Sequence, residues 1–251
     1  MDFLQNNDSA SRSHSLNILW GLSTFGEFME SISTVLDVGC GTGHDALWWA
    51  TATDGAEESP QPLNIQVTGL DIQNNINKEY EIPGNLKFKF KDWNTVKFKK
   101  QFDVVWTHNT LHTTQDPLKF LHKMNEFCAD GGMLVLSFPT TSNMFYGDPD
   151  YRIYQEVPHS ITMIHLIYML VLSGFNCNDG FFTKQPGTNI ISAIFYKDTD
   201  EVYNHGDQPL AEYNDLLPDS CQEQLKKYNY LTNKGLLLRW LDYQTLDYST
   251  F

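Results

Sequence analysis

Apolar and polar positions divide the chain into short hydrophobic runs, which predict strands, and longer periodic stretches, which predict helices. The short runs are Thr34–Val38, Ile65–Leu70, Leu86–Phe90, Phe102–Trp106 and Gly132–Phe138, and each is too short for a helix. The periodic stretches lie at Leu16–Met29, from His44 onward, at Leu118–Phe127 and at His159–Ser173. Strands that alternate with helices predict a parallel sheet with helices on both faces.

A hairpin closes this pattern, with strands predicted at Phe175–Thr183 and Asn189–Tyr196 around a Pro-Gly turn. It adds an antiparallel strand, whereas a plain dinucleotide-binding fold would close with a parallel one. The predicted fold is α/β, a Rossmann-like three-layer sandwich with a seven-stranded, mostly parallel sheet and an antiparallel final strand. We expect an N-terminal arm and cap helix (1–32), a core domain (33–197) and a C-terminal helical extension (198–251).

A glycine-rich turn, Gly39-Cys40-Gly41-Thr42-Gly43, joins the first strand to the helix that follows it. Glycines at alternate positions let the backbone turn tightly and approach a ligand that a Cβ atom would push away. A strand, a glycine turn and a helix N-terminus together form a cradle of backbone N–H groups. The spacing is not the G-x-G-x-x-G of dinucleotide-binding folds. Asp37, just before the turn, would repel a phosphate but suits a cation.

The combination Asp-x-Gly-x-Gly-x-Gly after a first strand resembles motif I of the class I S-adenosylmethionine-dependent methyltransferases, of the small-molecule type. The resemblance covers about Leu16–Tyr196. It implies S-adenosylmethionine as cofactor, with the ammonium of its methionine part received near Asp37 and Gly39. The cofactor-binding residues that we expect are Asp37, Gly39, Cys40, Gly41, Gly43, Asp71, Ile72, Asp92, Trp93, Thr107 and His108.

Two acids after the second and third strands carry the rest of the expected cofactor site. Asp71 ends the second strand, where a Rossmann-like fold presents a carboxylate to two ribose hydroxyls. The resemblance implies that Asp92 accepts a hydrogen bond from the adenine amino group, with Trp93 stacking on the ring. Both acids also suit ordinary turn aspartates, and Trp93 suits an exposed turn.

The fourth strand is followed by a polar turn that ends in Leu111-His112. Many small-molecule methyltransferases have Leu-His-His here, and Thr113 replaces their second histidine. The resemblance implies that Thr107 to His112 line the reaction centre. His112 and His108 are the candidate catalytic bases, because an imidazole has a pKa near neutrality. Each also suits a capping or core histidine.

The acceptor is expected to meet a long aromatic loop, Pro139–Pro158, because long loops at the carboxyl edge of a sheet commonly determine specificity. The candidate substrate-binding residues are Tyr146, Tyr151, His159 and Trp20, and His159 is a third candidate base. Trp20, on the helix before motif I, also suits a core position.

The formal net charge of −14 argues against nucleic acid as a partner, since that field repels phosphate backbones. The lysine-rich run Lys87–Lys100 is expected to be a strand and loop with solvated lysines. Cys40, Cys128, Cys177 and Cys221 are far apart and form no C-x-x-C pair, which argues against a metal site or a disulfide framework. With no secretory signal and no apolar run long enough to span a bilayer, we expect a cytoplasmic location and no membrane partner.

These residues together predict a methyltransferase that transfers a methyl group from S-adenosylmethionine to an oxygen or nitrogen atom of a small molecule. A homodimer is compatible with the apolar run Leu236–Leu241, which must be buried somewhere. Methylation of a peptide or protein, and a non-catalytic module that binds the cofactor and acts through partners, are open alternatives. So is other chemistry on the same cofactor. The glycine spacing and Asp37 disfavour a nicotinamide-dependent oxidoreductase.

Overall fold

The computed structural model describes Arg12, Ser15 and residues 31–53, 61–139, 161, 163–184, 190–198, 200 and 202. The strands are β1 (Thr34–Val38), β2 (Gln66–Asp71), β3 (Leu86–Phe90), β4 (Phe102–His108), β5 (Cys128–Pro139), β6 (Phe175–Lys184) and β7 (Ile190–Lys197). The helices are α3 (His44–Ala50), α4 (Pro117–Phe127) and α5 (Met163–Leu172), with a short 3₁₀ helix, η1 (Leu111–Thr113), after β4.

The described strands form one seven-stranded sheet in the order β3-β2-β1-β4-β5-β7-β6. The pairs β1–β2, β1–β4, β2–β3 and β4–β5 are parallel, and β7 is antiparallel to both β5 and β6. The predicted Rossmann-like α/β fold with an antiparallel final strand is therefore confirmed. The final strand lies between β5 and β6, so β6 and not β7 forms that edge of the sheet.

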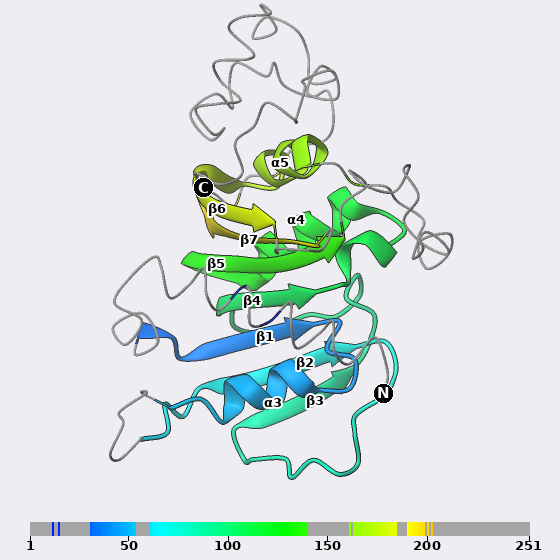
Figure 1. Ribbon diagram of the computed structural model, residues 1–251, viewed down its shortest axis with the longest axis vertical. Helices are drawn as coiled ribbons and strands as arrows, with labels where there is room; N and C mark the ends of the chain where they lie inside the picture. The colour runs from blue at the N-terminus through cyan, green and yellow to red at the C-terminus, as the bar shows by residue number, and fades with distance from the viewer. Residues whose placement is uncertain are drawn as a thin grey trace, which may run out of the picture.

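Helices cover both faces of the sheet, with α3 on one face and α4 and α5 on the other (Figure 1). Strand residues alternate between the two faces, since successive side chains of a strand point in opposite directions. Val35 packs with Ala46 and Trp49 of α3, whereas Leu36 packs in the cluster that holds α4 and α5. None of the described helices is long and apolar enough to cross a membrane.

Local signals explain where these elements start and stop. Asp116 caps α4 by accepting a hydrogen bond from the N–H of Lys119 at 2.9 Å, and Pro117 occupies the first helical position, where its missing N–H has no cost. Strand β4 runs two residues further than its apolar pattern predicts. The N–H and C=O groups of Thr107 and His108 join the ladder with Leu136 and Ser137 of β5.

Several predicted elements lie outside the described residues. They are the helix Leu16–Met29, most of the loop Pro139–Pro158, and the extension 198–251 apart from residues 198, 200 and 202. The proposed domain boundaries stay predictions.

Candidate functional site

The glycine turn adopts a backbone that only glycine accepts easily. Gly39, Gly41 and Gly43 have φ of 77°, 50° and 83°, in the left-handed region. The N–H groups of Gly39 and Cys40 both donate to the carbonyl of Leu70, at 2.8 and 3.2 Å. The turn after β1 is therefore fixed to the end of β2.

The three glycines differ in what surrounds them. A Cβ atom on Gly39 would lie 2.1 Å from Oγ1 of Thr110, and one on Gly43 would lie 2.9 Å from the ring of Phe88. A Cβ atom on Gly41 would meet nothing within 4 Å. Gly39 thus permits close packing against the turn after β4, and Gly43 permits close packing against β3, whereas Gly41 faces open space.

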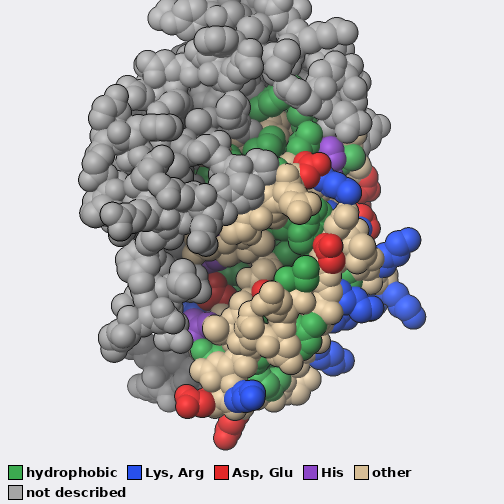
Figure 2. Space-filling view, turned by 90° about the vertical axis from the view of Figure 1, so that its right-hand side faces the viewer, with side chains coloured by type: hydrophobic (Ala, Val, Ile, Leu, Met, Phe, Trp, Pro, Cys, Tyr) green, Lys and Arg blue, Asp and Glu red, His purple; other side chains and the backbone are tan. Residues whose placement is uncertain are grey.

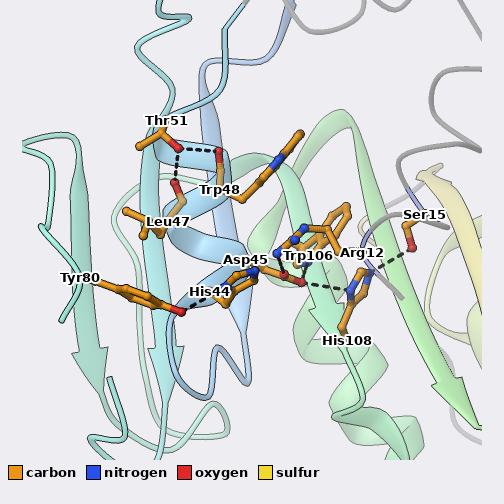
Figure 3. Close-up of polar contacts among 10 residues, drawn as sticks. All are labelled: Arg12, Ser15, His44, Asp45, Leu47, Trp48, Thr51, Tyr80, Trp106 and His108. Atoms are coloured by element: carbon orange, nitrogen blue, oxygen red, sulfur yellow. Dashed lines mark hydrogen bonds and ion pairs between the residues drawn. The ribbon is translucent and has the colours of Figure 1, made fainter. Parts of the chain in front are cut away.

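The carboxylate of Asp71 joins the end of β2 to this turn. One oxygen accepts a hydrogen bond from the N–H of Gly41 at 2.9 Å, and the other accepts from the N–H of Gln73 at 3.0 Å. The connection 72–85 folds back over the turn. The Asn77 N–H donates to Thr42 at 3.1 Å, and Nδ1 of His44 lies 3.0 Å from the Tyr80 hydroxyl (Figure 3). The carboxylate is half-buried and partly reachable from solvent.

A cavity of about 730 Å³ opens at the carboxyl ends of β1, β2 and β4 and along the start of α4. Figure 2 looks onto this side of the molecule, toward which the arrows of the parallel strands β1 to β5 point in Figure 1. The expected cofactor residues on its wall are Gly39, Asp71, Ile72, Asp92 and Trp93. Acidic and apolar groups therefore share one wall.

The part of the wall after β3 combines a fixed acid with apolar surface. Asp92 accepts a hydrogen bond from the N–H of Asn94 at 2.8 Å, which holds the turn. Trp93 packs edge-on against Phe120, with ring centroids 5.1 Å apart. Ile72 is 70% exposed, an unusual state for a large apolar side chain. This wall offers hydrogen-bond acceptors and a flat apolar surface.

Four expected cofactor residues lie in the core beside the cavity. Asp37 is 2% exposed and Thr107 is 1% exposed, and Oγ1 of Thr107 makes no hydrogen bond. Cys40 is buried beside Gly69, and burial, followed by the charges of Asp37 and Asp71, raises the pKa of its thiol. Gly43 packs against Phe88, as described above. The cofactor roles of these residues stay predictions.

His108 belongs to a buried network on the α3 face of the sheet (Figure 3). Asp45 accepts hydrogen bonds from Arg12 at 2.8 Å and from the Trp106 indole at 2.9 Å. Nδ1 of His108 lies 3.2 Å from the same carboxylate, and Nε2 lies 3.1 Å from the Ser15 hydroxyl. Burial favours the neutral acid, but the His108 imidazole, Trp106 and Arg12 outweigh it and lower the pKa of Asp45. The network joins the N-terminal segment, α3 and β4.

His112 sits in η1 with a different environment. His112 is 9% exposed, and Nδ1 of its imidazole has no hydrogen-bond partner. Burial lowers the pKa of this imidazole to about 4. His112 is therefore neutral at pH 7.

The stretch Thr107–His112, which the resemblance places at the reaction centre, contributes Asn109 and Thr110 to the cavity wall. Asn109 has φ of 53°, a left-handed conformation that asparagine tolerates, and Thr110 packs against Gly39. The lining residues outside the predicted set are Lys91, Asn94, Thr113, Thr114, Gln115, Asp116 and Lys119, with Val38 and Leu70 at the base of the cavity. The pair Asp116-Pro117 is typical of a helix start, and it could have located the last of these turns in the sequence.

The candidate acceptor residues Trp20, Tyr146, Tyr151 and His159 lie outside the described residues. Among the residues that the structure does describe, no group of three His, Cys, Asp or Glu side chains could hold a metal ion.

A family model described as a methyltransferase domain matches residues 16–179. No curated protein matches the chain. Among solved structures, a Listeria monocytogenes protein assigned as an S-adenosylmethionine-dependent methyltransferase is similar with a TM-score of 0.55 and 17% identity, covering 76% of this chain and 100% of that one.

Two further similar structures are methyltransferases that are named for a small molecule. Burkholderia thailandensis 1,6-didemethyltoxoflavin-N1-methyltransferase, with 1,6-didemethyltoxoflavin and S-adenosylhomocysteine bound, has a TM-score of 0.54 and 16% identity, covering 78% of this chain and 82% of that one. Human N-acetylserotonin methyltransferase, in complex with S-adenosylmethionine, has a TM-score of 0.52 and 18% identity over 68% of this chain. This chain spans 49% of the human protein's length. At these identities the likeness shows the fold.

Proposed function

Because this chain belongs to the methyltransferase domain family of class I S-adenosylmethionine-dependent methyltransferases, we propose that it methylates an oxygen or nitrogen atom of a small molecule. The predictions of the family, the Rossmann-like fold, a methyltransferase enzyme and S-adenosylmethionine as cofactor are confirmed. The acceptor, the methylated atom and the residues that act in the site are proposals.

The observation that carries the proposal is the open side of Gly41, beside the Asp71 carboxylate and the 730 Å³ cavity. A cradle without a side chain suits close approach of a ligand to the backbone. Asp71 and Asp92 offer acceptors to a ribose diol and an amino group, and Ile72 and Trp93 offer apolar surface to an adenine ring. The residues present therefore fit the cofactor.

When bound, S-adenosylmethionine supplies a methyl group on a positively charged sulfur that is already a good leaving group. The protein must then align the acceptor, exclude water and receive a proton if the acceptor loses one. The end of β4 is the place for the last task, because Asn109 and Thr110 bring it to the cavity wall.

Two histidines near this place differ in their fitness as a base. The Asp45 carboxylate lies 3.2 Å from Nδ1 of His108 and can hold the orientation of its imidazole. Burial lowers the pKa of His112 to about 4, which makes its imidazole a weak proton acceptor. His108 is therefore the first candidate base, and His112 is the second.

The small-molecule acceptor is supported by two considerations. The Burkholderia structure that resembles this chain holds 1,6-didemethyltoxoflavin, and the human one is named for N-acetylserotonin, and both are small molecules. The net charge of −14 disfavours phosphate-rich acceptors. A cytoplasmic location and a homodimer remain predictions.

The test combines binding and transfer. S-adenosylhomocysteine should raise the melting temperature of the purified chain, and incubation with methyl-labelled S-adenosylmethionine and a low-molecular-weight metabolite extract should label a product, identified by mass. Label in the protein fraction alone would favour a peptide or protein acceptor. A melting shift without any label transfer would favour a non-catalytic cofactor-binding module and refute the proposal.

A further inference from the structure

Three polar side chains form a row across the sheet beyond the cavity. His108 of β4 pairs in register with Ser137 of β5, and Ser137 pairs with Ser192 of β7. We call these three residues the polar row. Each lies two residues from a member of the apolar cluster on the α3 face, namely Trp106, Val135 and Ile194 respectively. Their side chains therefore point to the same face of the sheet.

The two serines of the polar row are buried without partners. Ser137 is 1% exposed and Ser192 is 0% exposed, and neither Oγ atom makes a hydrogen bond. Buried hydroxyls in native proteins are normally bonded, and one that is not calls for an explanation. Ser173, also 0% exposed, follows the rule by donating to the Met169 carbonyl at 2.7 Å. The two strand serines are the exception.

The register places both hydroxyls within reach of one bound atom. Directly opposed residues of an antiparallel pair have Cβ atoms about 4.5–5.5 Å apart. A single oxygen or nitrogen at hydrogen-bond distance, about 2.8 Å, can therefore bridge the two Oγ atoms. A hydroxyl both donates and accepts, so the pair suits a group that does the same.

The charge of this neighbourhood favours a neutral group. Asp45 is already paired with Arg12 at 2.8 Å and lies 3.2 Å from His108. Two hydroxyls alone do not compensate the burial of an ion. An uncharged hydroxyl, amide or ring nitrogen fits this place better than a carboxylate or an ammonium group.

The polar row is joined to the cavity wall through the backbone of Ser137. The carbonyl of Ser137 accepts a hydrogen bond from the N–H of Asn109 at 2.9 Å, and Asn109 lines the cavity wall. Ser137 thus holds the turn after β4 through its backbone carbonyl, and its hydroxyl points to the α3 face of the sheet. We propose that Ser137 and Ser192 bind an uncharged polar group of the methyl acceptor and so determine which acceptor is used. This inference rests on the proposed methyl transfer.

The experiment compares Ser137→Ala and Ser192→Ala with Ser173→Ala as the matched control. Without acceptor, the two row variants should melt at the wild-type temperature or above it, since each removes an unpaired buried hydroxyl. Ser173→Ala loses a made hydrogen bond and should melt about 2–4 °C lower. These measurements use the full chain saturated with S-adenosylhomocysteine.

Transfer is then measured with labelled S-adenosylmethionine and the metabolite extract at serial dilutions. Each row variant should need about tenfold more extract for half-maximal transfer, with an unchanged KM for S-adenosylmethionine. Ser173→Ala should keep the wild-type extract requirement.

Three results would overturn the inference, and they can be told apart. Row variants that melt lower, as Ser173→Ala does, would show that the hydroxyls bond a structural water. Row variants with an unchanged extract requirement would show that the serines do not touch the acceptor. A wild-type chain that transfers no label would refute the proposed function, and the acceptor site with it.

Discussion

Two regions at the carboxyl edge of the sheet differ in the groups that form them, which are main-chain groups in one region and buried polar side chains in the other. At β1 and β2 the cavity is shaped mainly by the main chain, namely by the glycine turn, its hydrogen bonds to the Leu70 carbonyl and the open side of Gly41. The side chain of Asp71 is half-exposed there. At β4, β5 and β7 the polar groups are buried side chains, namely His108, Ser137 and Ser192.

This difference suggests how the two ligands are recognised. Main-chain geometry repeats wherever the same turn occurs, so it suits a cofactor shared by many enzymes. A side-chain network depends on the residues of one chain, and it suits an acceptor that differs between enzymes. Four predictions test this contrast, from the largest expected effect to the smallest.

Asp45→Asn should give the largest effect, because it removes the Asp45 carboxylate from the buried ion pair with Arg12. Removal of one member of a buried pair typically costs about 3–5 kcal/mol of the free energy of unfolding. Urea unfolding measures it. In the double variant Arg12→Met/Asp45→Leu, both charges of this ion pair are removed and much of the loss should be recovered. A loss under about 1 kcal/mol in Asp45→Asn would mean that the network is not needed for the fold.

Gly39→Ala should lower the free energy of unfolding by about 2–3 kcal/mol, because the residue has positive φ and its Cβ would collide with Thr110. Gly41→Ala is the matched control. It carries backbone strain of about 1 kcal/mol but no collision. Its Cβ would enter the open cradle, so the melting shift caused by S-adenosylhomocysteine should disappear. Equal loss of stability in both variants would contradict the separate roles.

His112 should make stability depend on pH. Its folded pKa, about 4, lies below the unfolded value of 6.5, so between these values the unfolded chain binds a proton that the native state does not. The free energy of unfolding should therefore fall as the pH drops from 6.5 toward 4, by about 2 kcal/mol at pH 5. Asp45 acts in the same direction at lower pH, since its pKa is lowered.

Urea titrations of the wild type and His112→Gln at pH 5 and pH 7 measure this dependence. The variant should lose most of the difference between the two pH values. An unchanged difference would assign the effect to another group.

Asp71→Asn should weaken S-adenosylhomocysteine binding about tenfold, or about 1.4 kcal/mol, because a charged acceptor becomes a neutral one. Isothermal titration calorimetry measures it. Asp116→Asn is the control, since Asp116 lines the same cavity and asparagine caps α4 equally well. Similar losses in both variants would indicate a general electrostatic effect instead of a ribose contact.

What sequence could predict follows the same division. The glycine turn and the strands carry local signals, so the fold, the family and the cofactor followed from them. The burial of Asp45 had no local signal, because an acid in the first turn of α3 looks like a solvated helix start. Its partners Arg12 and Trp106 stand 33 and 61 positions away in the chain.

The polar row was hidden for a related reason. Ser137 and Ser192 become neighbours only through the register of β5 and β7. Thr107 and His108 looked like a turn because they are polar, and pairing with β5 draws them into β4. Tertiary pairing decided what local composition left ambiguous.

Strand β3 forms the outer edge of the sheet and carries the first part of the lysine-rich run, expected to be a strand and loop with solvated lysines. Lys87 and Lys89 are exposed there, as is Lys91 just beyond it, and they alternate with Phe88 and Phe90. Two copies that met edge to edge would bring rows of ammonium groups together. The repulsion between these lysines thus opposes edge-to-edge stacking of copies into fibres. Acetylation removes the charges, so acetylation of the lysines on this edge should make the protein prone to aggregate.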